Sequence, residues 1–237
     1  NAFVRELVQS GALGKIMRFT GTYDQDELLD ESLPITWRHI NKLAGCGALG
    51  DLGSHLLSIS QFIMGDITKV NAVATTVFPK RPKSAGSTEM VDVENEDIMT
   101  FMAEYANGAI GQIACSRVAT GRKNYLTYEI QGTKGSVRYD LERMGEVQVY
   151  FQSDNERDRG FRTVLLNPLM KGYSAFQPAG GISIAYNDMK ILEVHALFDA
   201  ITNGADYVTD FEFGYKIDRT VAAVIESSKT HEWVDVK

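Results

Sequence analysis

The sequence predicts an α+β fold built on a large, mostly antiparallel, open β-sheet. Residues 96–152 are a run of short segments in which apolar and polar residues alternate, joined by tight turns. Asn107-Gly108 is the strongest two-residue hairpin signal in the chain. Such alternation with short turns indicates a continuous antiparallel meander, with one face buried and the other polar or paired with a partner. Helical periodicity lies outside this run, so strands and helices are segregated along the chain.

The first ninety residues alternate between helix and strand. Residues 3–8 have the apolar spacing of one helix face, and this helix is expected to end near Gly11. Residues 15–24 alternate as a strand does. The β-branched residues of 67–78 predict a second strand that stops at a proline, and the composition of 80–88 predicts a loop.

The sheet run and the end of the chain complete the expected elements. The predicted strands are 98–105, 109–118, 126–130, 137–141, 147–151 and 161–166. Asn167–Asp188 has no clear period, and a segment of this length is either a functional loop or an irregular surface excursion. Helices are expected at 189–203 and, after the N-cap Asp210, up to residue 229, before a last strand at 231–236. His195 lies on an apolar helix and is expected to be a core histidine, whereas His39 and His231 are expected at loop or edge positions.

Composition bounds the class of protein. With 237 residues, 44% of them hydrophobic, the chain can bury a large core as one domain or a domain plus a small appendage. The net charge of −7 without a basic cluster argues against nucleic acid and against an anionic membrane surface as partners. Cys46 and Cys115 are too few for a disulfide framework, which favours a reducing, cytoplasmic location. Because the chain opens on Asn1 beside a helical pattern, we expect residues 1–237 to be part of a longer protein.

The segment Gly45–Gly65 concentrates the candidate chemistry. Its apolar residues follow the three-and-four spacing of a buried helix stripe, while Asp51 and His55 lie on a separate polar line with Ser58. A spacing of four on an α-helix puts a carboxylate and an imidazole on one face at adjacent turns. The pair could bind a metal, serve as a general acid and base, or be a structural pair; metal binding needs further ligands, and the other histidines are not at ligand spacing.

The glycines of this segment also match the G-x-G-x-x-G pattern of dinucleotide-binding loops. That pattern requires a preceding buried strand and a βαβ unit, whereas the residues before Gly45 do not read as a strand and the sheet that follows is antiparallel. We therefore expect these glycines to allow a close approach of backbone to a ligand, or to form the tight turn into the helix.

Three blocks of the chain resemble one enzyme family. WRHINKLAGCGALGDLGSHLLSISQFIMG is similar to W-R-x-(n)-G-G-G-x-L-x-D-x-G-x-H-x-x-D of the glucose-fructose oxidoreductase/inositol dehydrogenase (Gfo/Idh/MocA) family. The opening ELVQSGALGKIMRFTGTY and the ending from His195 to Val236 also resemble that family, in the same order. The chain departs from the family pattern at Cys46, where a glycine is usual, and at Ser58, where an aspartate or a similar residue is usual.

The resemblance implies more than a fold. It implies that helices pack on one face of the sheet and that the other face makes subunit contacts, in a homodimer or homotetramer. Residues 1–237 would be the C-terminal substrate-binding and oligomerisation domain, and the N-terminal dinucleotide-binding domain, which holds most of the NAD or NADP and a catalytic lysine, would be absent from this chain. His55 would exchange the proton of the substrate hydroxyl, Asp51 would orient His55, and Gly47 is a candidate for a close approach to the nicotinamide.

We therefore predict the substrate-binding portion of an NAD(P)-dependent dehydrogenase that transfers hydride between the nicotinamide and a hydroxyl carbon of a polyol, sugar or related compound, with no metal. The expected substrate contacts come from side chains that stack on or hydrogen-bond a sugar ring. They are Trp37, Arg38, Tyr173, Phe176, Tyr186 and Asn187. Two alternatives remain open: a non-catalytic binding or scaffold homologue, and a metal-dependent sugar isomerase or hydrolase that uses Asp51 and His55 as ligands.

Overall fold

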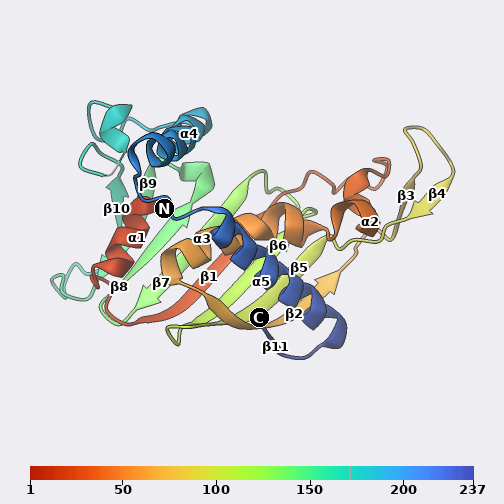
Figure 1. Cartoon of the computed structure of the whole chain (residues 1–237), viewed down its shortest axis with the longest axis horizontal. Coiled ribbons are helices and arrows are strands. Elements are labelled where there is room, and N and C mark those ends of the chain that lie inside the picture. Colours follow the sequence, from red (N-terminus) through yellow and green to blue (C-terminus); the bar gives the residue numbers. More distant parts are fainter. Residues whose placement is uncertain (171) are drawn as a thin grey trace.

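The structure, a computed structural model, describes residues 1–170 and 172–237. Its body is a nine-stranded sheet in the order β10-β9-β8-β7-β1-β6-β5-β2-β11 (Figure 1). The strands are β1 (Ile16–Asp24), β2 (Ile67–Thr75), β5 (Ile98–Tyr105), β6 (Ile110–Ser116), β7 (Tyr125–Gly132), β8 (Gly135–Asp140), β9 (Glu146–Phe151), β10 (Arg162–Leu165) and β11 (Val234–Asp235). The helices are α1 (Ala2–Gln9), α2 (Asn41–Ala44), α3 (Ser54–Met64), α4 (Tyr186–Asn203) and α5 (Phe211–Thr230). The predicted α+β class is confirmed.

The strand β1 lies in the middle of the sheet although it comes first in the chain. It pairs antiparallel with β7 and parallel with β6, so that Thr20 lies opposite both Glu129 and Gln112. The hairpins β5–β6, β7–β8 and β8–β9 are antiparallel, as predicted. The expected continuous meander is wrong at one step, because β1 is inserted between the consecutive strands β6 and β7.

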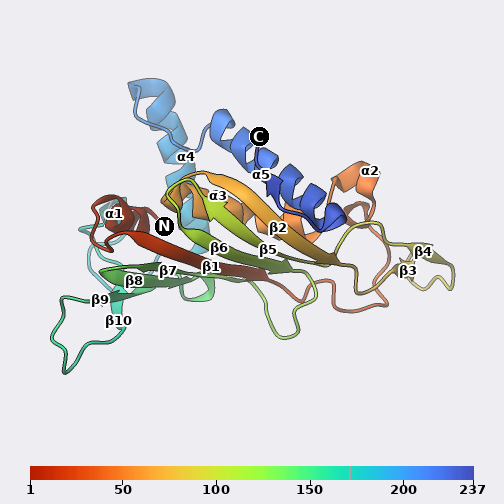
Figure 2. The same ribbon diagram turned by 90° about the horizontal axis from the view of Figure 1, so that it is seen from below.

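The helices α3 and α5 lie across one face of the sheet (Figure 2). Alternation along β1 turns Phe19 toward this face, where it is fully buried and stacks on Tyr128 with ring centroids 5.7 Å apart. Leu56 from α3 and Val224 from α5 are also fully buried in the same core. Burial of large apolar side chains of this kind, each worth about 1.5–3 kcal/mol, fixes α3 against the sheet. The core therefore positions the segment that the sequence singled out.

The helix α4 stands away from the sheet (Figure 2). Ile191, Val194, Phe198 and Ile201 recur at three-and-four spacing and are 56, 51, 60 and 70% exposed. None of the residues of α4 is buried. The expectation that His195 is a core histidine is wrong, because its helix does not pack on the core of the described chain and the histidine is exposed.

Two loop expectations also need correction. The strand β2 ends at Thr75 and not at Phe78, because the N–H groups of Val77 and Phe78 donate to Oδ2 of Asp97, at 2.8 and 3.2 Å, and leave the sheet ladder. The segment predicted as a loop forms part of a hairpin, in which β3 (Lys80–Pro82) pairs with β4 (Met90–Asp92).

The segment 167–188 contains a short helical turn, Tyr173–Ala175, and α4 already begins at Tyr186. Lys171, which belongs to the predicted loop, lies outside the described residues. The helix α5 begins at the predicted N-cap, since Oδ1 of Asp210 accepts from the N–H of Phe213 at 2.8 Å. None of the helices in the described ranges has the length and apolar character that crossing a bilayer requires.

Candidate active site

Asp51 and His55 lie at the junction of two kinds of helix. Residues Leu49–Gly53 form a π-helical turn, and the α-helix α3 begins only at Ser54. The expected uninterrupted α-helix is therefore wrong over its first turn, although the expected buried stripe is present. Single π-helical turns are rare and occur frequently at functional sites. Both side chains lie outside the fully buried core, with Asp51 half-buried and His55 exposed.

The glycines of the segment are explained by contacts within the chain. A Cβ on Gly47 would lie 1.9 Å from the carbonyl oxygen of Glu96, and one on Gly50 would lie 2.7 Å from Sγ of Cys46. Gly45 has a φ of 77°, which favours glycine. These glycines therefore serve the tight turn into the helix. The approach of Gly47 to a nicotinamide stays a prediction.

One residue that sequence reasoning missed binds the start of this turn. The carboxylate of Glu96 accepts from the N–H groups of Gly47 and Leu49, both at 2.9 Å, and its carbonyl oxygen accepts from the N–H of Ala48 at 3.0 Å. The first N–H groups of a helix have no partner within the helix, so an acceptor must be supplied from elsewhere. A glutamate in a loop carries no sequence signal for this role, because its partner segment is nearly fifty positions away.

The carboxylate of Asp51 is paired with Arg38. The Nε of Arg38 lies 3.3 Å from Oδ2 of Asp51, and the Arg38 guanidinium lies 4.7 Å from the centroid of the Trp37 ring. Both charged side chains are more than a third exposed, at 43 and 37%, so the ion pair contributes little to stability. The structure thus brings together three of the predicted site residues, with Arg38 in contact with both Trp37 and Asp51.

Two charged groups, Asp51 and Lys190, influence the imidazole of His55. Packing around the ring lowers the pKa of His55 by desolvating the charged form, and the positive charge of Lys190 lowers it further, while the negative charge of Asp51 raises it. Lowering of the pKa favours a neutral imidazole near pH 7, which is able to accept a proton. Because Asp51 favours the charged form, it stabilises the imidazole once a proton has been taken up.

Tyr23, at the end of β1, is a second site residue that the sequence did not single out. Its ring meets the His55 ring edge-on, with centroids 6.0 Å apart. Its hydroxyl donates to Oδ1 of Asn124 at 2.6 Å, and burial raises the pKa of Tyr23, with smaller contributions from Tyr186 and Asp51. The only sequence signal was its inward position in the alternation of β1. Tyr23 therefore forms the sheet side of the site.

A hollow of about 480 Å³ opens beside His55. It lies between α3 and the first turns of α5. Its lining includes Ser54, His55, Ser58, Asp210, Phe211 and Tyr215. Phe211 and Tyr215 are 100 and 62% exposed, so the hollow has aromatic walls next to a titratable group. This combination of apolar surface and a few polar groups is typical of small-molecule sites.

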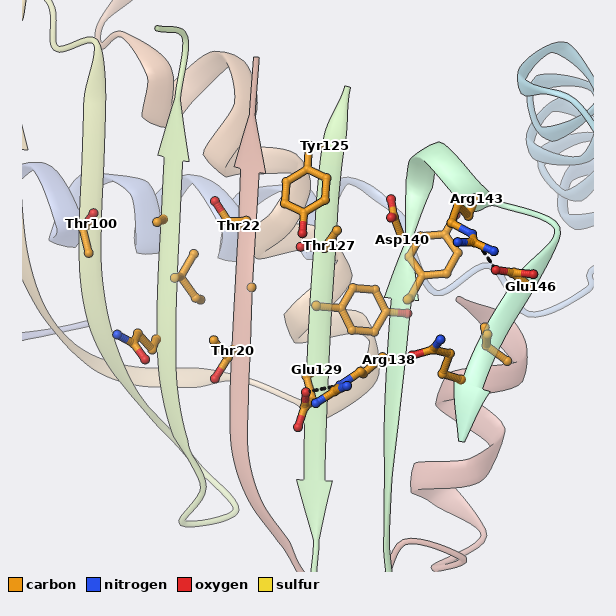
Figure 3. A pocket seen from close by; sticks show the side chains of 18 residues that line it. Thr20, Thr22, Thr100, Tyr125, Thr127, Glu129, Arg138, Asp140, Arg143 and Glu146 are labelled. Atoms are coloured by element: carbon orange, nitrogen blue, oxygen red, sulfur yellow. Dashed lines mark hydrogen bonds and ion pairs between the residues drawn. The ribbon is translucent and has the colours of Figure 1, made fainter. Parts of the chain in front are cut away.

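A second hollow, of about 550 Å³, lies on the opposite face of the sheet (Figure 3). Thr20, Thr22 and Thr127 point into it, and the ion pair between Arg138 and Glu129 crosses its floor. Neither Asp51 nor His55 contributes to its lining. The two faces of the sheet thus carry separate features, and the candidate chemistry is on the helix-covered one.

The loop residues predicted to contact substrate fall into two groups. Tyr186 and Asn187, at the start of α4, are exposed, and the Tyr186 ring is close enough to Tyr23 to raise its pKa. Tyr173 is 4% exposed and its hydroxyl donates to the carbonyl oxygen of Ile182, which favours a role in holding the loop over a substrate contact. Phe176 is half-buried. Within the described chain, neither Tyr173 nor Phe176 forms a hydrogen bond or an aromatic contact with Asp51 or His55.

Histidine and acidic side chains do not form a larger cluster around this pair. In the part of the chain that the structure describes, no group of three or more His, Cys, Asp or Glu side chains is placed to hold a metal ion. His39 is fully buried and not at a loop surface as its sequence context suggested, because its Nδ1 accepts from the N–H of Thr36 at 2.9 Å inside a turn.

The chain is similar to known proteins along almost its whole length. A model of the GFO/IDH/MocA C-terminal domain matches residues 2–138. The levoglucosan dehydrogenase of Pseudarthrobacter phenanthrenivorans is 38% identical over 99% of this chain. The D-apiose dehydrogenase of Rhizobium rhizogenes is 30% identical over 40% of the chain and 26% of its own length. The chain spans 63% of the length of the levoglucosan dehydrogenase, which is less than two thirds.

Solved structures show the same fold. A levoglucosan dehydrogenase in complex with NADH superimposes with a TM-score of 0.95 at 38% identity, over 100% of this chain and 62% of its own. A levoglucosan dehydrogenase with NADH and levoglucosan gives a TM-score of 0.94, also at 38% identity, over the same shares of the two chains. An NAD binding oxidoreductase from Klebsiella pneumoniae gives a TM-score of 0.94 at 38% identity, over 99% of this chain and 63% of its own.

Proposed function

Because the chain belongs to the Gfo/Idh/MocA family, we propose that it is the substrate-binding portion of an NAD(P)-dependent dehydrogenase that acts on a hydroxyl carbon of a sugar, a polyol or a related compound. One observation carries the proposal most directly: His55, four residues after Asp51, lines a hollow of about 480 Å³ in a fold shared with a levoglucosan dehydrogenase that binds NADH and levoglucosan. A cyclic sugar is therefore the substrate class to test first.

In the proposed reaction His55 acts on the substrate hydroxyl. Its neutral imidazole accepts the hydroxyl proton as the carbon gives up a hydride, and general-base catalysis of this kind contributes about 10² to 10⁴-fold in rate. The carboxylate of Asp51 then stabilises the imidazolium. Arg38, paired with Asp51 at 3.3 Å, holds the carboxylate in place and extends the polar wall of the site toward Trp37. A bound oxidised nicotinamide would accept the hydride.

The turn at Gly47 does not fit the phosphates of a dinucleotide. The space that a phosphate loop would leave beside Gly47 is filled by the carbonyl oxygen of Glu96. We therefore propose that NAD or NADP is bound mainly by a dinucleotide-binding domain outside residues 1–237. The exposed stripe of Ile191, Val194, Phe198 and Ile201 on α4 supports this proposal, because an apolar helix face of this kind is typical of a surface that packs on further protein.

The open face of the sheet supports the proposed assembly into a homodimer or homotetramer. Val73, Met102 and Ile110 are 59, 50 and 52% exposed on β2, β5 and β6. Val73 pairs with Thr100 and Met102 with Gln112, and both partners line the hollow on this face. Apolar side chains interspersed with threonines and paired charges are suited to a protein interface. Light scattering of the full-length protein tests this directly, and a monomeric mass would contradict it.

The activity is tested on the full-length protein with NAD⁺ and NADP⁺ over a panel of anhydrosugars, aldoses, ketoses and polyols, following the absorbance of the reduced nicotinamide. The proposal expects reduction with at least one cyclic sugar and no loss of activity with a chelator. Activity that depends on added metal would favour the isomerase or hydrolase alternative. A full-length protein that binds sugar but neither NAD⁺ nor NADP⁺ would favour the non-catalytic alternative.

A further inference from the structure

Glu96 lies in the loop before β5, opposite the turn that enters the π-helical segment. Three consecutive N–H groups of that turn, from Gly47, Ala48 and Leu49, bind this single residue at 2.9, 3.0 and 2.9 Å. Two of the three bonds go to its carboxylate. A carboxylate at the start of a helical turn satisfies N–H groups that the helix leaves free and is favoured by the positive end of the helix dipole. Hydrogen bonds to an ionised acceptor are also stronger than neutral ones.

The backbone of Glu96 is itself held rigidly. The carbonyl oxygen that accepts from Ala48 also accepts from Nη2 of Arg117, at 3.1 Å, and Arg117 is 2% exposed. Gly47 packs so closely that a Cβ would lie 1.9 Å from the same oxygen. Hydrogen bonds and close packing therefore both hold the turn against Glu96.

The turn in turn sets the position of Asp51. The N–H of Asp51 donates to the carbonyl oxygen of Gly47 at 3.1 Å, which joins the proposed acid–base pair to the first residue that Glu96 binds. We propose, building on the proposed function, that Glu96 is a positioning residue whose carboxylate holds the π-helical turn so that Asp51 faces His55. It touches neither substrate nor nicotinamide and acts through Asp51.

Glu96→Gln in the full-length protein is the matched perturbation. Glutamine keeps the shape but offers one acceptor oxygen and an NH₂ donor, so one of the two N–H groups that the carboxylate accepts from is left facing a donor. A shift of about 1 Å in a catalytic group can cost about a hundredfold in rate, so we expect kcat to fall by about ten- to a hundredfold with a smaller change in KM.

Glu94→Gln is the control. Glu94 lies two residues away in the same loop, and its Oε2 also accepts a backbone N–H, from Asn41 at 2.7 Å, but this bond holds α2 and not the turn before Asp51. The control is expected to leave kcat within about twofold of the wild type, because glutamine keeps an acceptor oxygen for this single N–H group and the site is exposed.

A double-mutant cycle separates positioning from general stability. If Glu96 acts through Asp51, Glu96→Gln costs little in a protein that already carries Asp51→Asn, because the group it positions is gone. An equal loss of kcat in both backgrounds would overturn the proposal, and so would a Glu96→Gln protein with the kcat of the wild type.

Two measurements need no turnover and therefore distinguish failure of this proposal from failure of the proposed function. In NMR titrations of the histidine-labelled full-length protein, Glu96→Gln is expected to move the pKa of His55 toward its value in Asp51→Asn, and an unchanged pKa would overturn the proposal. In the wild type, amide hydrogen exchange at residues 47–49 is expected to be slow. Exchange as fast as that of an exposed loop would overturn the proposal even if Glu96→Gln does not fold.

Discussion

The contact between Gly47 and the carbonyl oxygen of Glu96 predicts a large effect of Gly47→Ala. The added Cβ would lie 1.9 Å from this oxygen, and the two segments would have to separate by about 1.5 Å to reach the 3.4 Å at which ordinary contact begins. Overpacking of this kind typically costs about 1–3 kcal/mol. The same separation would break the hydrogen bonds from Gly47, Ala48 and Leu49 to Glu96, at about 1 kcal/mol each. We expect a loss of about 3 kcal/mol or more in the free energy of unfolding.

Gly45→Ala provides the comparison two residues earlier. Gly45 has a φ of 77° but no atom within 4 Å of its absent Cβ, so alanine there costs only the backbone strain of about 1–2 kcal/mol. Urea denaturation of both variants measures the difference. A Gly47→Ala protein that unfolds at the same urea concentration as Gly45→Ala, with the same slope, would contradict the steric role of Gly47.

Three further predictions concern charge and reactivity. Burial lowers the pKa of His39 below its ordinary 6.5, so the unfolded chain binds more protons than the folded chain. The contribution of His39 to the free energy of unfolding is therefore full above about pH 6.5 and is lost as the pH drops below it. Urea denaturation at several pH values should show that this acid-induced loss of stability is smaller in His39→Gln. Arg38→Ala removes a half-exposed pair with Asp51 and should lower the free energy of unfolding by less than about 1 kcal/mol, with a larger loss measured by denaturation contradicting the exposed geometry. Burial raises the pKa of the Cys46 thiol to about 11 and that of the fully buried Cys115 still higher, so mass spectrometry after alkylation of the native protein should find slow modification at Cys46 and none at Cys115.

Local signals in the sequence predicted most of the fold. The hairpin at Asn107-Gly108 and the alternation of the strands on either side of it are properties of neighbouring residues, and the structure confirms them. The place of β1 between β6 and β7 could not be predicted in this way, because it depends on a parallel pairing of Thr20 with Gln112, which are far apart in the chain. The periodicity within β1 shows which side chains point inward but not which strands lie beside it.

The burial of two histidines, His195 and His39, could not be predicted from neighbouring residues either. The helix of His195 is apolar on more than one side, so its periodicity could not show that the described chain leaves it unpacked. His39 follows exposed Trp37 and half-exposed Arg38, and its burial results from a turn whose hydrogen bonds are visible only in three dimensions.

The part of the candidate site that lies within one short segment could be predicted from the sequence. Asp51 and His55 share a short stretch, and their spacing with the surrounding glycines drew attention to both. Tyr23, Glu96 and the aromatic wall from Phe211 reach the site from other elements, so only the folded chain shows their contribution. Glu96 and Glu94 are the same residue type in the same loop, and they differ in the segment that each binds: Glu96 binds the turn before Asp51, and Glu94 binds Asn41.

The proposed role of His55 is tested most directly by steady-state kinetics of His55→Ala in the full-length protein, with the sugar that the wild type turns over fastest. His195→Ala is the control, since this histidine is exposed on α4 and has no part in the proposed chemistry. The proposed mechanism predicts that His55→Ala lowers kcat by about 10² to 10⁴-fold while His195→Ala does not. A His55→Ala enzyme that keeps its kcat within a few-fold of the wild type would contradict it.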